Sequence, residues 1–195
     1  MNNDLRISKL QKFVVADEDK CVGCKACELA CYFSHNRMDR NVALTVGTVN
    51  SPVMPKLFVT KSEGENMPVV CRHCEDAPCL NVCEYGAIDR TEDGIVINHA
   101  KCSGCKDCLM ACPFGAIELY PLFEDGEKTA KIDSDEARMA AYKCDLCMDR
   151  PGGPACVETC PHKALRLVSI EEDTDDKLIK AANNAQMARR FKVDR

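Results

Sequence analysis

Cysteine is the residue through which this chain is best equipped for chemistry. All 16 cysteines fall into four groups of four, each of which begins with C-x2-C and ends with C-x3-C. The groups are Cys21, Cys24, Cys27 and Cys31; Cys71, Cys74, Cys79 and Cys83; Cys102, Cys105, Cys108 and Cys112; and Cys144, Cys147, Cys156 and Cys160. A C-x2-C pair closes a disulfide on itself only with strain, whereas repeated short spacings let neighbouring turns present thiolates to one compact metal centre. The spacing therefore favours metal ligation over the disulfide framework of a secreted protein.

The third group has the most diagnostic form. Residues 101–113 read KCSGCKDCLMACP, the C-x2-C-x2-C-x3-C-P run by which bacterial-type ferredoxins hold [4Fe-4S] clusters, with the fourth cysteine serving a second cluster. A four-residue step advances a helix by about 6 Å, so this fourth cysteine can reach an adjacent cluster. The first group repeats the spacing without the proline, and the middle gap widens to four residues in the second group and to eight in the fourth.

Exchange of the fourth cysteine between paired groups predicts four [4Fe-4S] clusters held by four ligand sets. Groups two and three are neighbours in the chain, which leaves groups one and four to pair with each other. Set A consists of Cys21, Cys24, Cys27 and Cys160, and set B of Cys31, Cys144, Cys147 and Cys156. Set C consists of Cys71, Cys74, Cys79 and Cys112, and set D of Cys83, Cys102, Cys105 and Cys108. All sixteen cysteines are thus expected to be metal ligands, and no catalytic residue is predicted.

Glycines and prolines in the cysteine groups fit this interpretation. Gly23 and Gly104 lie inside the first C-x2-C of groups one and three, where the missing Cβ would let backbone N–H groups approach cluster sulfur. Pro113 and Pro161 follow the fourth cysteine of groups three and four and disfavour helical geometry at that cysteine.

Zinc is the main chemical alternative, because two C-x2-C pairs also make a tetrahedral site of four thiolates. A structural zinc site has no use, however, for a fourth cysteine at C-x3-C followed by proline. Four histidines could be ligands or proton carriers, namely His35, His73, His99 and His162. Because every set already has four thiolates, we expect these histidines to pack or to form hydrogen bonds.

Lysines near the cysteine groups could act electrostatically. The cysteine loops carry Lys25, Lys101, Lys106 and Lys143. Most surface lysines are simply solvated, but a lysine close to an anionic cluster would raise its reduction potential.

The stretches between the cysteine groups predict an α+β fold. Residues 13–16 and 164–168 read as strands, residues 87–98 as two strands joined by a tight turn, and residues 116–120 as a further strand. Loop, strand, hairpin, loop and strand is the order of a two-cluster ferredoxin.

We therefore expect two interleaved bacterial-type ferredoxin modules. The inner module covers residues 68–120, and the outer module combines residues 1–67 and 121–170. A β-rich insertion at residues 32–67 includes the runs 42–49 and 56–60.

The tail, residues 171–195, is predicted to be a helix because its start is acidic and its end is basic. Its apolar residues lie on or near one thin face, Leu178, Ala181, Ala182, Ala185, Ala188 and Phe191. This face could pack on the protein itself or dock another subunit.

Composition bounds the classes of function and location. The net charge is -5 before clusters are counted, and each [4Fe-4S] core with its four thiolates adds about -2, so nucleic acid is not expected as a partner. No run approaches about 18 apolar residues and no secretion signal is visible, so we expect a cytoplasmic protein without a membrane span. Aromatic residues make up only 5% of the chain, which leaves bound metal as a main source of stability.

Together the four motifs resemble a known family. The segments KCVGCKACELAC, CRHCEDAPCLNVC, KCSGCKDCLMACPFGAI, and KCDLCMDR with PACVETCP are similar to those of the four-cluster iron–sulfur subunits of molybdopterin oxidoreductases, of the dimethyl sulfoxide reductase type, and of formate hydrogenlyase-type complexes. The resemblance covers about residues 12 to 168 and implies the same exchange of ligands between groups.

The resemblance implies an electron-transfer subunit that is not an enzyme by itself. Its partners would be catalytic oxidoreductase subunits of anaerobes, formate dehydrogenase and/or hydrogenase, as in hydrogen-dependent carbon dioxide reductases, with homologous iron–sulfur subunits and self-assembly through the tail helix. A free polyferredoxin carrier, a carbon monoxide dehydrogenase-linked ferredoxin subunit and a zinc-stabilised interaction protein are the alternatives.

Overall fold

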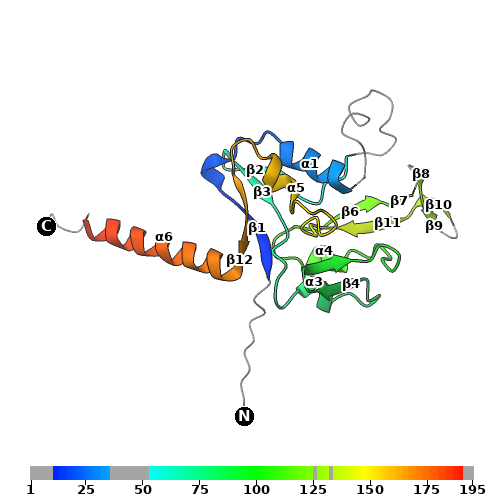
Figure 1. Cartoon of the computed structure of the whole chain (residues 1–195). Helices are drawn as coiled ribbons and strands as arrows, with labels where there is room; N and C mark the ends of the chain where they lie inside the picture. The colour runs from blue at the N-terminus through cyan, green and yellow to red at the C-terminus, as the bar shows by residue number, and fades with distance from the viewer. Residues whose placement is uncertain (1–10, 36–52, 125–126, 132–133, 191–195) are drawn as a thin grey trace, which may run out of the picture.

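The computed structural model describes residues 11–35, 53–124, 127–131 and 134–190, in which short helices and two-stranded sheets alternate (Figure 1). In chain order the elements are β1 (Lys12–Ala16), the 3-10 helix η1 (Glu18–Lys20), α1 (Ala26–His35), β2 (Phe58–Ser62), β3 (Glu65–Val69), α3 (Pro78–Asn81), β4 (Ile88–Thr91), β5 (Gly94–Ile97), α4 (Asp107–Ala111), β6 (Glu118–Pro121), β7 (Phe123–Glu124), β8 (Glu127–Lys128), β9 (Ala130–Lys131), β10 (Ser134–Ala137), β11 (Met139–Tyr142), α5 (Ala155–Thr159), β12 (Leu165–Ser169) and α6 (Ile170–Arg190). The predicted α+β class is confirmed.

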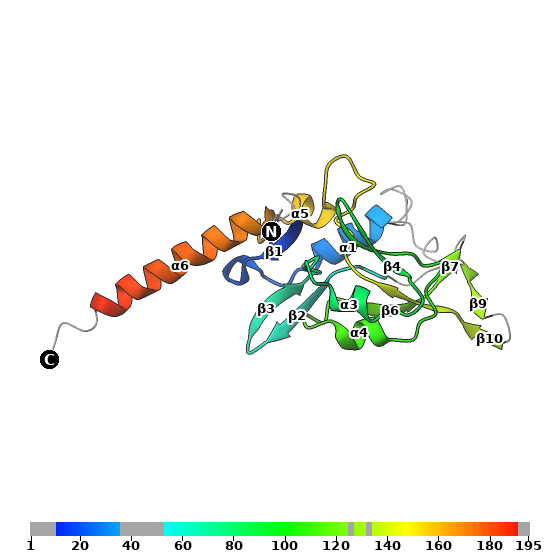
Figure 2. The same ribbon diagram turned by 90° about the horizontal axis from the view of Figure 1, so that it is seen from below.

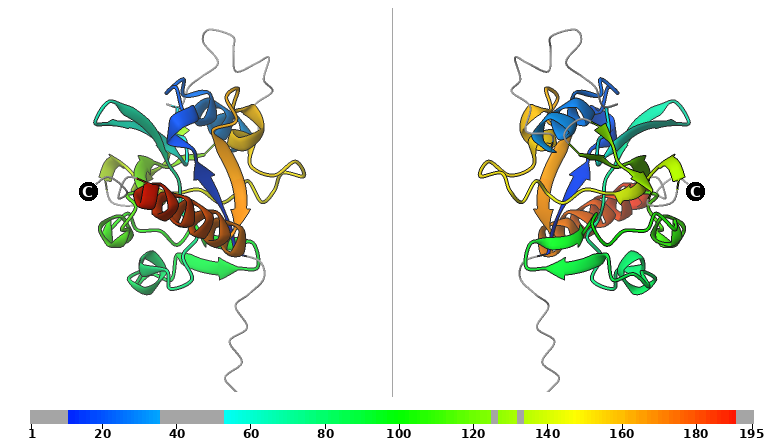
Figure 3. Two further views of the ribbon diagram at one scale, coloured as in Figure 1. Left: turned by 90° about the vertical axis from the view of Figure 1, so that its left-hand side faces the viewer. Right: turned by 90° about the vertical axis from the view of Figure 1, so that its right-hand side faces the viewer.

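The first and last strands of the described chain pair in one antiparallel sheet. β1 pairs with β12, so that Phe13 lies opposite Val168 and Val14 opposite Leu167 (Figure 3). Alternate residues face opposite sides of a strand, and here both sides of β1 are covered: Val14 packs with the cysteine loops, while Phe13 packs with Val168 and Ile170. Burial on both faces explains why residues 13–16 are a continuous apolar run.

Two hairpins and one longer ribbon make up most of the remaining sheet structure. β4 and β5 are joined by a two-residue loop, as the turn residues predict, and β2 and β3 by Glu63 and Gly64, which both have positive φ. β6 pairs with β11, and the small strands β7 to β10 lie at the far end of this ribbon (Figure 1). In the expected β-rich insertion, residues 58–60 of the run 56–60 fall in β2, residues 32–35 belong to α1, and the run 42–49 lies outside the described residues.

Two hydrophobic cores occupy the body of the molecule, and cysteines form a large share of both. The first core consists of Val14, Cys27, Cys31, Leu57, Val70, Cys144, Leu146, Cys156 and Leu165. The second core consists of Ala77, Cys79, Ala87, Ile88, Ile95, Cys102, Cys108, Ile117, Leu122, Ala140 and Ala141. The first core thus gathers cysteines of groups one and four, and the second gathers cysteines of groups two and three. β11 contributes Ala140 and Ala141 to the second core, although its residues fall in the segment 121–170.

α6 begins in a capping box and then leaves the body of the protein (Figure 2). The backbone N–H of Glu172 donates to Ser169 Oγ at 3.2 Å, and the backbone N–H of Ser169 donates to Glu172 Oε2 at 2.8 Å. Beyond its first turn the helix is exposed, including Leu178, Ile179 and Met187, while Phe191 lies outside the described residues. Among the described residues, no helix is both long and apolar enough to cross a membrane.

Candidate metal centre

Three of the four ligand sets each line a single cavity. Around one cavity Cys83 of group two joins three cysteines of group three. Around a second, Cys112 of group three joins three cysteines of group two. Around a third, Cys160 of group four joins three cysteines of group one. The cavities are lined by set D, set C and set A respectively. Cysteines from two separate groups therefore converge at each of these cavities.

The cysteines of the remaining set, set B, are all buried. Burial and then the nearby thiolates of Cys31, Cys147 and Cys27 raise the pKa of Cys156 to about 12. Burial, with Cys156 and Cys31 adding to it, also raises the pKa of Cys144 well above its usual value. Three of the four set B cysteines, Cys31, Cys144 and Cys156, belong to the first core.

Backbone N–H groups point at six of the cysteine sulfurs. After the fourth cysteine of a group, Ala87 N–H donates to Cys83 Sγ at 3.4 Å, and Ala164 N–H donates to Cys160 Sγ at 3.3 Å. The other four bonds run from His73 to Cys71, from Leu146 to Cys144, from Lys56 to Cys31 and from Ala141 to Cys102. A hydrogen bond to sulfur favours its thiolate form, so the backbone itself prepares these thiols as ligands.

The turns that carry the cysteines follow from residue type. Cys112 and Cys160, which precede prolines, have extended ψ angles of 113° and 110° and end α4 and α5. Tyr32 stands in the corresponding position of the first group, and there α1 continues through Cys31 to His35. A following proline thus ends the helix at the fourth cysteine in groups three and four, whereas in group two α3 ends at Asn81 although Glu84 follows Cys83.

Gly104 is required for a reason other than the one expected from the sequence. It has a φ of +75°, and a Cβ at this position would lie 2.7 Å from the carbonyl oxygen of Met139 in β11. The corresponding Gly23 has a φ of +71° and faces the side chain of Asn66. The missing Cβ admits a neighbouring segment of chain in both loops.

The buried thiols fit a cationic metal core. Burial, with smaller contributions from nearby charges, raises the pKa of Cys27 and of Cys108 to about 11, and burial raises the pKa of Cys74 and Cys79. Four crowded thiols of this kind stay protonated by themselves, whereas metal ions bind the thiolate and offset the mutual repulsion. The donor sets are therefore matched to iron–sulfur clusters.

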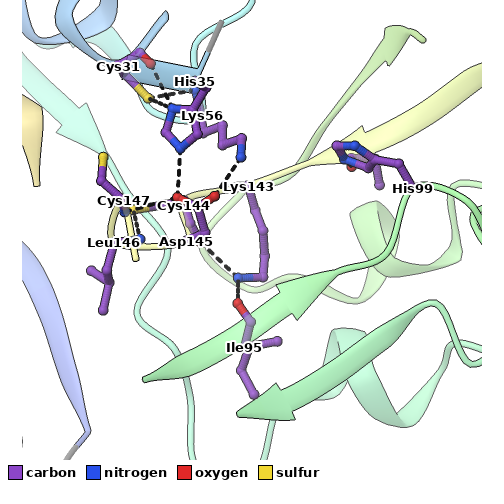
Figure 4. Close-up of polar contacts among 11 residues, drawn as sticks. Cys31, His35, Lys56, Ile95, His99, Lys143, Cys144, Asp145, Leu146 and Cys147 are labelled. Atoms are coloured by element: carbon purple, nitrogen blue, oxygen red, sulfur yellow. Dashed lines mark hydrogen bonds and ion pairs between the residues drawn. The ribbon is translucent and has the colours of Figure 1, made fainter. Parts of the chain in front are cut away.

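An ion-pair network lies beside set B (Figure 4). The two carboxylate oxygens of Asp145 bind His35 Nε2 at 2.8 Å and Lys56 Nζ at 2.6 Å. His35 Nδ1 lies 2.7 Å from the carbonyl oxygen of Cys31, and Cys147 N–H donates to Asp145 Oδ1 at 3.0 Å. The network thus ties α1 and the segment before β2 to the loop of the fourth cysteine group.

Asp145 and its partners hold each other in their charged forms. Burial alone would lower the pKa of His35, but the hydrogen bonds to Asp145 and Cys31 raise it to about 10. Burial alone would raise the pKa of Asp145, but its bond to His35 and the charge of Lys56 hold it far below its usual value. His35, Asp145 and Cys147 have ligand atoms within 4.8 Å of one another, but Cys147 belongs to set B and both oxygens of Asp145 are already bound.

The other histidines pack or form hydrogen bonds. His99 Nε2 lies 3.1 Å from the carbonyl oxygen of Ala141, and its ring packs on Tyr142 at 4.4 Å. His73 is fully buried and accepts a hydrogen bond from the backbone of Ile95, while exposed His162 lines the cavity of set A. Sequence reasoning did not single out Asp145 or Lys56, because 89 residues separate these two partners.

Comparison with known proteins agrees with the geometry. The family model of the 4Fe-4S dicluster domain matches residues 63–170. The chain belongs to this family. The chain is 40% identical over 158 residues to the electron transport protein HydN of Escherichia coli (strain K12), an alignment that covers 80% of this chain and 87% of HydN. It is 38% identical to formate hydrogenlyase subunit 2 of the same strain, with 82% of each chain covered.

A third relative is much longer. "Putative oxidoreductase AegA" of Escherichia coli (strain K12) is 39% identical over 160 residues, which are 82% of this chain but only 22% of AegA. The family confirms the resemblance read from the cysteine motifs and supports [4Fe-4S] clusters as the bound group rather than zinc. HydN carries the name of an electron transport protein, in agreement with the expectation that this chain is not an enzyme by itself.

Replacement of Asp145 by Asn should destabilise the protein in a pH-dependent way. The raised pKa of His35 contributes stability that is fully present below about pH 6.5 and is lost as the pH rises through about 10. The lowered pKa of Asp145 contributes stability above about pH 4, its usual value, that is lost only as the pH falls further. We expect Asp145→Asn to lower the free energy of unfolding at pH 6.5 by about 1–3 kcal/mol, measured by urea denaturation. The loss should be smaller at pH 10.

Asp176→Asn is the matched control, because Asp176 pairs with Arg166 on the exposed surface. We expect a change of no more than about 0.5 kcal/mol at either pH. An equal loss for Asp145→Asn at pH 6.5 and pH 10 would contradict the assigned charges.

Proposed function

We propose that this chain is an electron-transfer subunit with four [4Fe-4S] clusters that relays single electrons between subunits of a cytoplasmic anaerobic oxidoreductase complex. The observation that carries the proposal is the convergence of cysteines from two separate groups around one cavity, which occurs in sets A, C and D. A [4Fe-4S] cluster bound by such a set takes up and releases one electron at a time. The chain holds the sets in fixed places and buries all four cysteines of set B.

In this proposal sets A and B form an outer ferredoxin module, residues 1–67 and 121–170, and sets C and D form an inner module, residues 68–120. The two hydrophobic cores support this division, because each contains cysteines of one pair of groups. β11 packs with the second core, so the inner module extends through packing into the ribbon formed with β6. The pairing of β1 with β12 supports an outer module made of two separate segments, because it joins residues before position 67 to residues after position 121.

The burial of the cysteines supports an order of the sets. Cys71 of set C is among the thiols that raise the pKa of fully buried Cys144 of set B, so these two sets are neighbours across the module boundary. Cys24 of set A and Cys105 of set D are the two exposed cysteines. Sets B and C thus lie in the middle, and sets A and D bring one thiol each to the surface, where redox partners can approach.

Exposed apolar residues near sets A and D favour a subunit of a complex over a free carrier. Val22 lines the cavity of set A and Tyr85 the cavity of set D, and both are more than half exposed. Met110, in α4 near set D, is 81% exposed. Apolar side chains gathered near redox centres are typical of protein–protein contacts.

The names of the relatives point to the kind of complex. Formate hydrogenlyase subunit 2 and HydN support catalytic partners that act on formate or hydrogen, a formate dehydrogenase and/or a hydrogenase, in an arrangement of the hydrogen-dependent carbon dioxide reductase type. A free polyferredoxin carrier or a carbon monoxide dehydrogenase-linked subunit would differ in its partners. Affinity purification from the native anaerobe decides between them, because a subunit brings down a large catalytic chain in fixed stoichiometry and a free carrier does not.

Iron and sulfide analysis tests the number of clusters. Protein purified without oxygen should contain about 16 iron atoms and about 16 acid-labile sulfides per chain, from four clusters of four. Zinc without iron or sulfide would refute the electron-transfer function altogether. About 8 of each would show that only one module carries clusters.

Cysteine pairs test the exchange of ligands. Cys74→Ala and Cys112→Ala should each leave about three intact [4Fe-4S] clusters, counted by Mössbauer spectroscopy, because each removes a ligand from set C. The double variant should still have about three, whereas Cys105→Ala with Cys112→Ala should have about two. The opposite pattern of the two double variants would mean that each group keeps its own fourth cysteine.

For α6 we propose a role in assembly, either between copies of this chain or with a homologous iron–sulfur subunit. The helix projects from the body, and Leu178, Ile179 and Met187 are exposed on it without packing against the body (Figure 2). Deletion of residues 171–195 should reduce the mass of the assembly measured by light scattering and leave the iron content unchanged. An unchanged mass would remove this role.

A further inference from the structure

Three lysines occupy the same place in the sequence but not in the structure. Lys20, Lys101 and Lys143 each directly precede the first cysteine of a group. Lys20 and Lys101 are exposed, whereas Lys143 is only 3% exposed. Sequence alone gives no reason to separate them, so the burial of Lys143 calls for a physical explanation.

The Lys143 ammonium is bound by backbone carbonyls alone (Figure 4). Its Nζ donates to the carbonyl oxygen of Cys144 at 2.9 Å and to that of Ile95 in β5. No ion pair joins Lys143 to a carboxylate among the residues that the structure describes. Asp145, two residues away, is already bound to His35 and Lys56.

His73 binds the other polar backbone group of Ile95. His73 Nδ1 accepts a hydrogen bond from the backbone N–H of Ile95 at 3.0 Å, so that Ile95 is bound by His73 through its N–H and by Lys143 through its carbonyl. Burial lowers the pKa of His73 to about 3, and the charge of Lys143 is the next cause. A neutral ring that accepts at Nδ1 carries its hydrogen on Nε2, and Nε2 is buried with no hydrogen-bond partner among the described residues.

This pair of buried polar residues lies at the boundary between sets B and C. Lys143 is adjacent to Cys144 of set B, and its charge also acts on Cys79 of set C. Burial and the charge of Cys71 raise the pKa of Cys79, whereas the charge of Lys143 lowers it. A buried ammonium with two neutral acceptors is costly unless an anion lies nearby. Two clusters with their thiolates, each with a charge of about -2, would supply that anion from both sides.

We propose that Lys143 is the counter-charge shared by the clusters of sets B and C and that it raises the reduction potentials of both. The proposal rests on the four-cluster function above. Uptake of one electron makes a cluster more negative, so a fixed cation nearby stabilises the reduced form more than the oxidised form. In a protein interior this interaction is screened less than at the surface, which is why Lys143 should act more strongly than an exposed lysine.

The test is a redox titration of the complete chain with dithionite as the one-electron reductant, followed by EPR spectroscopy. Lys143→Gln retains an amide that can donate to the same carbonyls but removes the charge, and Lys143→Arg retains the charge. Lys101→Gln is the matched control, since it removes an exposed lysine from the corresponding position beside Cys102.

We expect Lys143→Gln to lower two of the four midpoint potentials, each by about tenfold in the reduction equilibrium constant, or about 59 mV. Lys143→Arg should keep all four midpoint potentials near those of the unchanged protein. Lys101→Gln should change no reduction equilibrium constant by more than about twofold. Four unaltered potentials in Lys143→Gln, or an equal shift of all four, would overturn the proposal.

Cluster content covers the case in which Lys143→Gln does not assemble. Loss of about half of the iron in Lys143→Gln with full iron in Lys143→Arg supports a required charge. Equal loss in both variants would show that Lys143 acts through its shape, and the proposal would then be wrong. Absence of iron and sulfide from the unchanged protein would instead refute the four-cluster function on which the proposal rests.

Discussion

The convergence of thiols from separate stretches of chain is the constraint on which the rest of this structure depends. At three cavities among the described residues, three cysteines of one group are joined by one cysteine of another group. The chain must therefore bring two separate loops together at each of these cavities. The short helices α3, α4 and α5, with four or five residues each, are just long enough to carry one cysteine from the loop to its neighbour.

Negative charge on the cysteine ligands is a second constraint on the cores. The cores are poor in aromatic residues and rich in cysteines, so they would gather negative charge as soon as the thiols became ligands. Backbone N–H groups directed at sulfur, the buried ammonium of Lys143 and the charged His35–Asp145–Lys56 network all lie beside cysteines of these cores. In the proposed function the same contacts therefore set both stability and redox behaviour.

Spacing was enough to predict much of this arrangement. The turn residues 91–94 predicted the hairpin of β4 and β5, and the acidic start of the tail predicted α6. The ligand sets stay a prediction, which the lining of three cavities supports. Ser169 and Glu172 match the capping-box pattern S-x-x-E, which is a local signal for the start of α6. These features are local, so sequence distance does not hide them.

Interactions between distant segments could not be predicted in this way. His35 and Asp145 are 110 residues apart, and the buried Lys143 donates to the carbonyl oxygen of Ile95 in β5, 48 residues away. The packing of β11 with the second core likewise depends on its pairing with β6, which no periodicity reveals. The close approach of Met139 to Gly104 also depends on the fold.

The pairing of β1 with β12 also imposes an order on synthesis. A ribosome releases Cys21, Cys24 and Cys27 before Cys160 and β12, which emerge more than 130 residues later. The second core is complete once β11 has emerged, so the middle of the chain can fold before β1 finds its partner strand. In the proposed function, three thiols of set A therefore wait longest for their fourth partner, and oxygen or another metal has the longest access to them.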